Sequence, residues 1–327
     1  MPKRSIGWNG FRVEVEIPGR VADAVRRVVP RQDRGEAAGT RPLVEFPPSV
    51  PPLRLQDPRD SVDGYMRGLR ETLEWYPDGW GGPPSIETDD PEKSVSKVHW
   101  YHTIELPGGV VTPGFYDHRP LVPHYGLPDD LTGKLALDVG VWDGFWSFEL
   151  ERRGAEVTAV DLDRLSRVDL PPAARQAVID ANLDQPFGAG FKLAHRALGS
   201  KVRRVVGSVY DLDPAELGTF DFVHFADVSL HLERPLEAFR KIRSVTHGTA
   251  MIVDAVHLDL DDDTGRRLTE YLGGWSDVIW WTPSLNTFAQ MVLDAGFSDV
   301  RVQRVYRLNP RVGPGPGMWR AIVIARP

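Results

Sequence analysis

Hydrophobic and polar positions alternate between two kinds of pattern in the second half of the chain. Short apolar runs that suit buried parallel strands occupy residues 135–139, 156–160, 203–206, 220–225 and 250–256. Apolar positions at helical spacing occupy residues 145–153, 190–198, 235–245 and 284–295. Two further strands are expected at residues 300–305 and 319–325, the last one antiparallel. This order predicts a doubly wound α/β sheet over residues 135–327.

Residues 1–96 follow a different pattern and are predicted to form an N-terminal extension. Residues 11–17 alternate as a strand does, and residues 21–29 and 62–75 are spaced like helices. The proline-rich residues 41–60 suit neither a helix interior nor a central strand, so we expect an extended strap over another surface. The extension is expected to cover the substrate side of the domain, or else to be a mobile or dimer-forming appendage. The chain could therefore form a homo-oligomer.

Residues 97–134 form a lead-in that is rich in aromatic and histidine residues. Loops of this kind often carry working residues. His99 and His102 have the spacing of metal ligands, but no carboxylate pattern completes a site, so we predict no metal. The lead-in residues expected to line a pocket or to act in catalysis are Trp100, His102, Asp117 and His118.

The apolar run at residues 135–139 breaks at Gly140 and then opens a helix, which is typical of a nucleotide-cofactor site. A dinucleotide fingerprint needs a second glycine where this chain has Trp142, and an indole there obstructs the approach of a pyrophosphate. A cofactor with one nucleoside and an amino-acid tail, S-adenosylmethionine, fits instead. Asp161 ends the next strand, at the place where an acidic side chain hydrogen-bonds both ribose hydroxyls. These residues predict a Rossmann-like methyltransferase domain.

Other candidate cofactor residues follow the remaining strands. Ser208 and Val209 are expected at the edge of the adenine, and Ala226 and Asp227 beside the methionine part. The complete set of predicted cofactor residues is Asp138, Gly140, Trp142, Asp143, Asp161, Ser208, Val209, Ala226 and Asp227.

Catalytic and acceptor-binding candidates lie in three places. His231 is the best-placed general base in the core domain, or else it caps the following helix; His102 and Asp117 are the other catalytic candidates. Trp280 and Trp281 either fill the core or touch a planar substrate. Arg320 suggests an anionic group on the acceptor, with a structural salt bridge as the alternative.

Composition narrows the classes of partner. The 327 residues suffice for one large domain with an appendage. A formal net charge of −7 argues against broad, sequence-independent binding of nucleic acid. The absence of cysteine excludes disulfides and thiolate metal sites. No apolar run of about 18 residues and no signal peptide are present, so we expect no membrane association and a cytoplasmic location by default.

Residues 100–114, Asp117–Arg119 and the region from about residue 96 to the end resemble the tRNA wobble-uridine (carboxy)methyltransferases. That group uses carboxy-S-adenosylmethionine, whose extra carboxylate is held by a lysine, a tyrosine and an arginine. The resemblance places these anchors at His102, Leu230 and Arg320. Because leucine does not hydrogen-bond a carboxylate, we expect the plain methyl donor here.

The sequence therefore predicts an S-adenosylmethionine-dependent methyltransferase. The expected acceptor is a small molecule, such as a natural-product or sugar-like intermediate that can carry an anionic group. Two alternatives stay open: a modifier of the tRNA wobble uridine, as the resemblance implies, and a non-catalytic partner subunit that binds the cofactor.

Overall fold

The computed structural model describes residues 3–8, 11–16, 43–46, 53–55, 100–172, 175–176, 179, 187–261, 264–273, 279–311 and 317–327. The helices expected at residues 21–29 and 62–75 lie outside this part of the chain. Within it, every helix is too short or too polar to cross a membrane.

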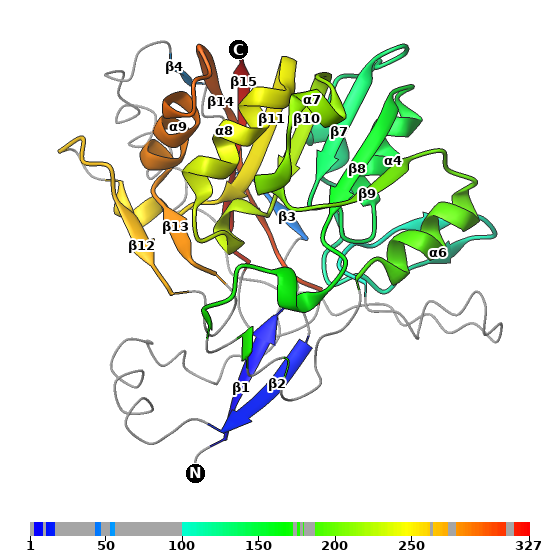
Figure 1. The fold of residues 1–327 in the computed structure, drawn as a ribbon, viewed down its shortest axis with the longest axis horizontal. Coiled ribbons are helices and arrows are strands. Elements are labelled where there is room, and N and C mark those ends of the chain that lie inside the picture. Colours follow the sequence, from blue (N-terminus) through cyan, green and yellow to red (C-terminus); the bar gives the residue numbers. More distant parts are fainter. Residues whose placement is uncertain are drawn as a thin grey trace.

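A nine-stranded sheet forms the centre of the molecule (Figure 1). Its strands are β3 (Val44–Glu45), β4 (Leu53–Leu55), β7 (Leu135–Val139), β8 (Glu156–Asp161), β9 (Arg203–Val206), β10 (Phe220–Ala226), β11 (Thr246–Ala255), β14 (Asp299–Leu308) and β15 (Trp319–Arg326). They lie in the order β3-β14-β15-β11-β10-β7-β8-β9, and β4 also pairs with β14.

Strands β9, β8, β7, β10 and β11 are parallel, whereas β15 is antiparallel to both of its neighbours. The structure thus confirms the predicted doubly wound sheet with an antiparallel last strand. The strand order reverses between β7 and β10, and ligands bind at the carboxyl ends of strands at such a switch point.

Short helices connect the strands and cover the sheet. The α-helices are α3 (Val122–Tyr125), α4 (Phe145–Arg152), α6 (Ala189–Leu198), α7 (Pro214–Leu217), α8 (Pro235–Val245) and α9 (Leu285–Asp294). Single 3₁₀ turns are η2 (Leu165–Arg167), η3 (Val209–Asp211), η4 (Ser229–His231) and η5 (Leu258–Leu260). Three antiparallel pairs lie apart from the sheet: β1 (Lys3–Trp8) with β2 (Phe11–Glu16), β5 (Glu105–Leu106) with β6 (Val110–Val111), and β12 (Thr269–Tyr271) with β13 (Trp281–Pro283).

Predicted and observed element boundaries agree closely, with larger differences at β14, which ends three residues after the predicted end, and at β11. This strand starts at Thr246, four residues before the predicted start, directly where α8 ends. The hydroxyl of Thr246 donates to the carbonyl of Ile242 in the last turn of α8. The threonine therefore joins the two elements without a loop, which a hydrophobic pattern does not reveal.

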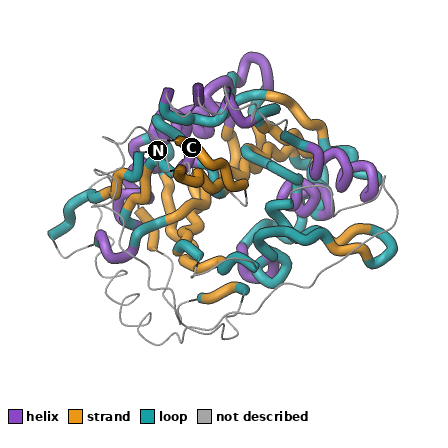
Figure 2. The backbone as a smooth tube through the Cα atoms, turned by 90° about the horizontal axis from the view of Figure 1, so that it is seen from below, coloured by secondary structure: helices purple, strands orange, loops and turns teal. Residues whose placement is uncertain are grey.

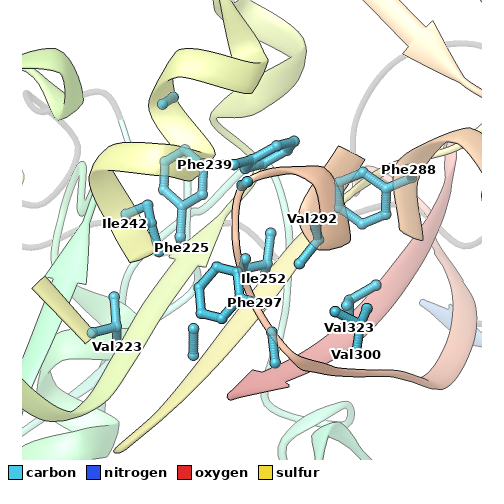
Figure 3. Close-up of a cluster of buried hydrophobic side chains, with 14 of the residues drawn as sticks. Val223, Phe225, Phe239, Ile242, Ile252, Phe288, Val292, Phe297, Val300 and Val323 are labelled. Atoms are coloured by element: carbon cyan, nitrogen blue, oxygen red, sulfur yellow. The ribbon is translucent and has the colours of Figure 1, made fainter. Parts of the chain in front are cut away.

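The core has two layers because side chains alternate across each strand. On one face, Phe225 and Ile252 of the sheet pack against Phe239 of α8 and Phe288 of α9 (Figure 3). On the other face, Phe222, Met251 and Val253 belong to a second cluster with α4, α6 and the lead-in. Figure 2 shows the strands with helices on both sides.

The proline-rich part of the N-terminal extension completes one edge of the sheet. Strands β3 and β4 both pair antiparallel with β14. Glu45 is buried, and its carboxylate accepts hydrogen bonds from Arg307 at 2.8 Å and from Asn309 at 2.5 Å. The described pieces of the predicted strap thus run as short edge strands, as its prolines allow.

Candidate active site

A crevice opens at the carboxyl ends of β7, β8 and β10, where the strand order reverses. It encloses about 870 Å³ of space, part of it open to solvent. This volume is in the range of sites that hold small molecules and cofactors. The predicted site residues that line it are His102, Asp138, Gly140, Trp142, Asp161, Ser208, Ala226, Asp227 and His231.

The glycine turn after β7 is built from two residues with positive φ. Gly140 has a φ of 80°, and a Cβ atom there would lie 2.2 Å from Cγ2 of Val228. Trp142 has a φ of 51°, a conformation that bulky residues rarely adopt. Its backbone N–H donates to Asp161 at 2.8 Å, so the turn and the end of β8 are tied together.

Asp161 is a buried carboxyl group in the wall of the crevice. Burial raises its pKa to about 6, against the opposing effects of Arg204 and of the N–H groups of Trp142 and Leu162. Strongly shifted groups in a crevice are typical of functional sites. A ligand hydroxyl at this place would add donors to a carboxylate that burial has partly desolvated.

On the other side of the crevice, Asp227 directly follows β10 and has a φ of 54°. Its carboxylate accepts a hydrogen bond from Nε of Arg320 at 2.6 Å, and the hydroxyl of Tyr101 lies 3.4 Å away. Arg320 is buried and does not line the crevice. The structure therefore shows the salt bridge that was the alternative for Arg320, and a contact of this arginine with an acceptor anion stays a prediction.

A second buried network borders the crevice and includes a residue that the sequence analysis missed, His224. His224 donates or accepts at both ring nitrogens, with Asp138 at 2.8 Å from Nδ1 and the hydroxyl of Tyr125 at 2.9 Å from Nε2. Ser147 donates to the same Asp138 carboxylate at 2.5 Å. A histidine inside the apolar run of β10 was the available signal, since buried polar groups need partners. Tyr101 and Asp169, which also line the crevice, carried no such signal.

Asp143 lies behind the crevice wall and not in it. Its buried carboxylate accepts hydrogen bonds from the backbone N–H groups of Tyr101 and His102, at 2.8 and 2.9 Å, and contacts Nδ1 of His102. The prediction that Asp143 contacts the cofactor does not fit this position. The carboxylate instead fastens the lead-in to the glycine turn.

Several other predicted residues also lie outside the crevice lining. Asp117 pairs with Arg119 at 2.7 Å, and burial holds the pKa of His118 well below its usual range. The indole N–H of Trp280 donates to the carbonyl of Asp169, and that of Trp281 donates to the carbonyl of Glu233. Both N–H groups are therefore used in hydrogen bonds within the chain. Trp100 and Val209 are buried in the hydrophobic clusters.

No group of histidine, aspartate or glutamate side chains suited to a metal ion occurs among the described residues. Carboxylates do line the crevice, at Asp138, Asp161, Asp169 and Asp227. The cation that lines it is Arg167, which pairs with Asp163 at 3.3 Å. This donor set favours a positively charged ligand over an anionic one.

Comparison with known proteins assigns the region that builds this crevice. Residues 137–253, from β7 to β11, match the methyltransferase domain family. The chain is also similar to the magnesium-protoporphyrin O-methyltransferase of Rhodobacter capsulatus, with 34% identity over 113 residues. That alignment covers 33% of this chain and 38% of the relative, so the chain spans well under half of the relative's length.

Solved structures show similar folds at low identity. The 1,6-didemethyltoxoflavin-N1-methyltransferase of Burkholderia thailandensis, bound to S-adenosylhomocysteine, is 19% identical with a TM-score of 0.41, over 64% of this chain and 76% of that one. The N-terminal domain of EvdMO1, bound to S-adenosylhomocysteine and D-fucose, is 15% identical with a TM-score of 0.47, over 74% and 99%. The match over residues 137–253 confirms the predicted methyltransferase domain in that part of the chain.

Proposed function

With a methyltransferase domain over residues 137–253 as the starting point, we propose that the chain transfers a methyl group from S-adenosylmethionine to a small-molecule acceptor. The observation that carries the proposal is the crevice at the switch point, with Gly140 and Asp161 on adjacent strand ends. The similarity to a relative named an O-methyltransferase supports oxygen as the acceptor atom.

The residues present suit the cofactor. When bound, S-adenosylmethionine supplies a methyl group on a positively charged sulfur, and a crevice lined by carboxylates favours that charge. Asp161 would accept hydrogen bonds from the ribose hydroxyls, and Ser208 would border the adenine. Ala226 and Asp227 would lie beside the methionine part. The protein's remaining task is to align the acceptor with the sulfur and to exclude water.

Isothermal titration with S-adenosylhomocysteine tests the donor site. Wild type should bind, and Asp161→Asn should weaken binding by about 10–100-fold, because hydrogen bonds to a charged group contribute roughly 1.5–3 kcal/mol. The matched control is Asp130→Asn, which changes an exposed aspartate on the loop before β7 and should leave the affinity unchanged. Failure of the wild type to bind would contradict the proposal.

A tRNA acceptor is the second candidate, favoured by the resemblance of residues 96–327. The formal charge of −7 and the carboxylates in the crevice count against it. Filter binding with total tRNA at 50 and 200 mM salt separates the two acceptors. A tRNA enzyme should bind at low salt and lose affinity steeply, whereas we expect no binding at either concentration.

A non-catalytic partner subunit is the third candidate. Incubation of wild type with radiolabelled donor and the fractions of a cell extract separates it from an enzyme. We expect label to transfer to a small-molecule fraction. Donor binding without transfer to any fraction would favour the partner subunit.

A further inference from the structure

His102 lines the crevice, and its imidazole contacts a buried carboxylate, Asp143. Asp143 is 1% exposed and receives three contacts from the lead-in, namely the N–H of Tyr101, the N–H of His102 and Nδ1 of His102. The same carboxylate thus fixes the backbone that carries the ring and one nitrogen of the ring. The ring also stacks on Phe145, with centroids 5.6 Å apart and planes 15° from parallel.

This contact selects one tautomer. An ionised carboxylate only accepts hydrogen bonds, so the ring proton sits on Nδ1 and donates to Asp143, which leaves the lone pair of the neutral ring on Nε2. Within the described residues, no hydrogen bond engages Nε2 of His102, and His102 is one of the residues that line the crevice. The available lone pair therefore belongs to a residue of the wall where an acceptor would bind.

The other imidazoles near the crevice are arranged differently. His224 has both nitrogens engaged, by Asp138 and by Tyr125. His118 is fully buried with its centroid 4.8 Å from that of His102, and does not line the crevice. His231 lines the crevice on η4, and it is the residue against which a role for His102 must be tested.

The charges that line the crevice limit the chemical class of the acceptor. Asp138, Asp161 and Asp227 line the crevice, and Arg320 is already paired with Asp227. An anionic acceptor would meet these carboxylates, and the arginine that lines the crevice, Arg167, is paired with Asp163. A carboxylate acceptor is also ionised at neutral pH and needs no base, whereas a hydroxyl does.

We propose that His102 is the general base of the methyl transfer, that Asp143 positions it, and that the acceptor is a neutral hydroxyl group. The inference rests on the proposed methyltransferase function. As the hydroxyl oxygen bonds to the methyl carbon, the carbon–sulfur bond breaks and its electron pair stays on sulfur. Nε2 takes the hydroxyl proton, and the resulting imidazolium is stabilised by the Asp143 carboxylate until solvent removes the proton.

Kinetics of variants test the two roles. The probe is the small-molecule fraction of a cell extract with radiolabelled donor. His102→Gln and Asp143→Asn should each lower kcat by roughly 10²–10⁴-fold, the range for loss of a general base. Their affinity for S-adenosylhomocysteine should stay within about threefold of wild type. The matched control is His247→Gln, an exposed histidine whose Nε2 lies 3.3 Å from Asp221, and it should keep the wild-type rate. A wild-type rate in His102→Gln with a large loss in His231→Gln would overturn the proposal.

The chemical stability of the product tests the acceptor class. Methyl esters release methanol in mild alkali, whereas methyl ethers do not. We expect a product that is stable in alkali. Release of labelled methanol in alkali would show that the acceptor is a carboxylate and would overturn the proposal of a hydroxyl acceptor.

Nitrogen-15 spectra of labelled protein test the tautomer without turnover. The signals of His102 are those absent in His102→Gln, and should show a proton on Nδ1 that Asp143→Asn shifts or removes. A proton on Nε2 of the neutral ring would overturn the role of Asp143. If S-adenosylhomocysteine binds but no fraction accepts label, the proposed function fails and the acceptor inference with it, while these spectra still decide the geometry.

Discussion

Trp142 and Asp227 hold backbone conformations with φ of 51° and 54°, although neither is glycine. Such conformations cost about 1–3 kcal/mol each and persist where surrounding contacts enforce them. Here the N–H of Trp142 is bound by Asp161, and the N–H of Asp227 by the carbonyl of Val253. Both residues line the crevice, so the strain is located at the site where a ligand would bind.

At the same scale, Gly140→Ala should destabilise the protein more than Gly133→Ala. Both glycines have positive φ, 80° and 72°, but only at Gly140 would the new methyl group meet a neighbour, Val228. Overpacking of this kind costs about 1–3 kcal/mol beyond the shared backbone strain. Denaturant unfolding measures the difference. The double variant Gly140→Ala/Val228→Ala should recover most of it, and equal losses in the two single variants would contradict the role of Val228.

The raised pKa of Asp161, about 6, predicts a pH dependence of donor binding. If ribose hydroxyls donate to its carboxylate, affinity should rise from pH 5 to pH 7 and then level off, by at most about tenfold per pH unit. Titration with S-adenosylhomocysteine from pH 5 to pH 8 measures this, and Asp161→Asn should bind weakly with a flat profile. A flat profile in the wild type would contradict the ribose role.

The raised pKa of Asp161 affects the stability of the fold in the opposite direction, since stability should fall as pH rises. The folded protein holds the Asp161 proton more tightly than the unfolded chain, whose carboxyl has a reference pKa of 3.8. The contribution of this group to the free energy of unfolding should therefore decrease as pH rises from about 4 to about 6.

At the scale of elements, the turn η4 carries Leu230 and His231 and is held by one carboxylate. Asp254, at the end of β11, accepts the N–H and hydroxyl of Ser229, both at 2.6 Å, and the N–H of Leu230 at 3.2 Å. Burial, and secondarily the charge of Asp227, raise the pKa of Asp254 to about 7. The position of η4 thus depends on a group that titrates near neutral pH.

Asp254→Ala should unfold more easily by about 2–5 kcal/mol, because it leaves several buried donors unpaired. It should also weaken methyl transfer, since η4 lines the crevice. The matched control is Asp261→Ala, whose carboxylate accepts the N–H groups of Leu285 and Asn286 at the start of α9, away from the crevice. Thermal unfolding and transfer assays together should show similar destabilisation in both variants but lost transfer only in Asp254→Ala.

The sequence predicted the main elements because their hydrophobic periods are long and local. It also found the glycine turn, since Gly140 and the strand before it are contiguous. It did not find the partner of Arg320, because Asp227 is 93 residues away and only the tertiary structure brings them together. The same holds for Asp143, whose contact with His102 spans 41 residues and changes its role from ligand contact to support.

At the scale of the whole molecule, β3 lies on the outer side of β14 and belongs to the N-terminal extension. A strand of two residues is too short to show an alternating hydrophobic pattern. The sequence could therefore indicate an extended strap but not that it pairs with β14. The structure adds that an ion pair of the buried Glu45 with the partly buried Arg307 joins the extension to the sheet. An unpaired edge strand exposes backbone groups with which another chain can pair. Strands β3 and β4 cover the outer edge of β14 and so occupy such groups.

Glu45→Ala should lower the free energy of unfolding by about 3–5 kcal/mol, because Arg307 and Asn309 lose a buried partner. Asp299→Ala, at the other end of β14, removes an exposed pair with Arg326 and should cost only about 0.2–1 kcal/mol. Denaturant unfolding compares the two variants. Similar losses would mean that the contact of Glu45 with β14 is not maintained in solution.

The pairing of β3 with β14 also imposes an order on assembly during synthesis. Arg307 follows Glu45 by 262 residues. At roughly 5–20 residues per second, a ribosome needs about 13–52 s to make the intervening chain. The strands that border the crevice, β7, β8 and β10, all emerge within that interval, so this part of the nascent protein can form while β3 and β4 still have nothing to pair with.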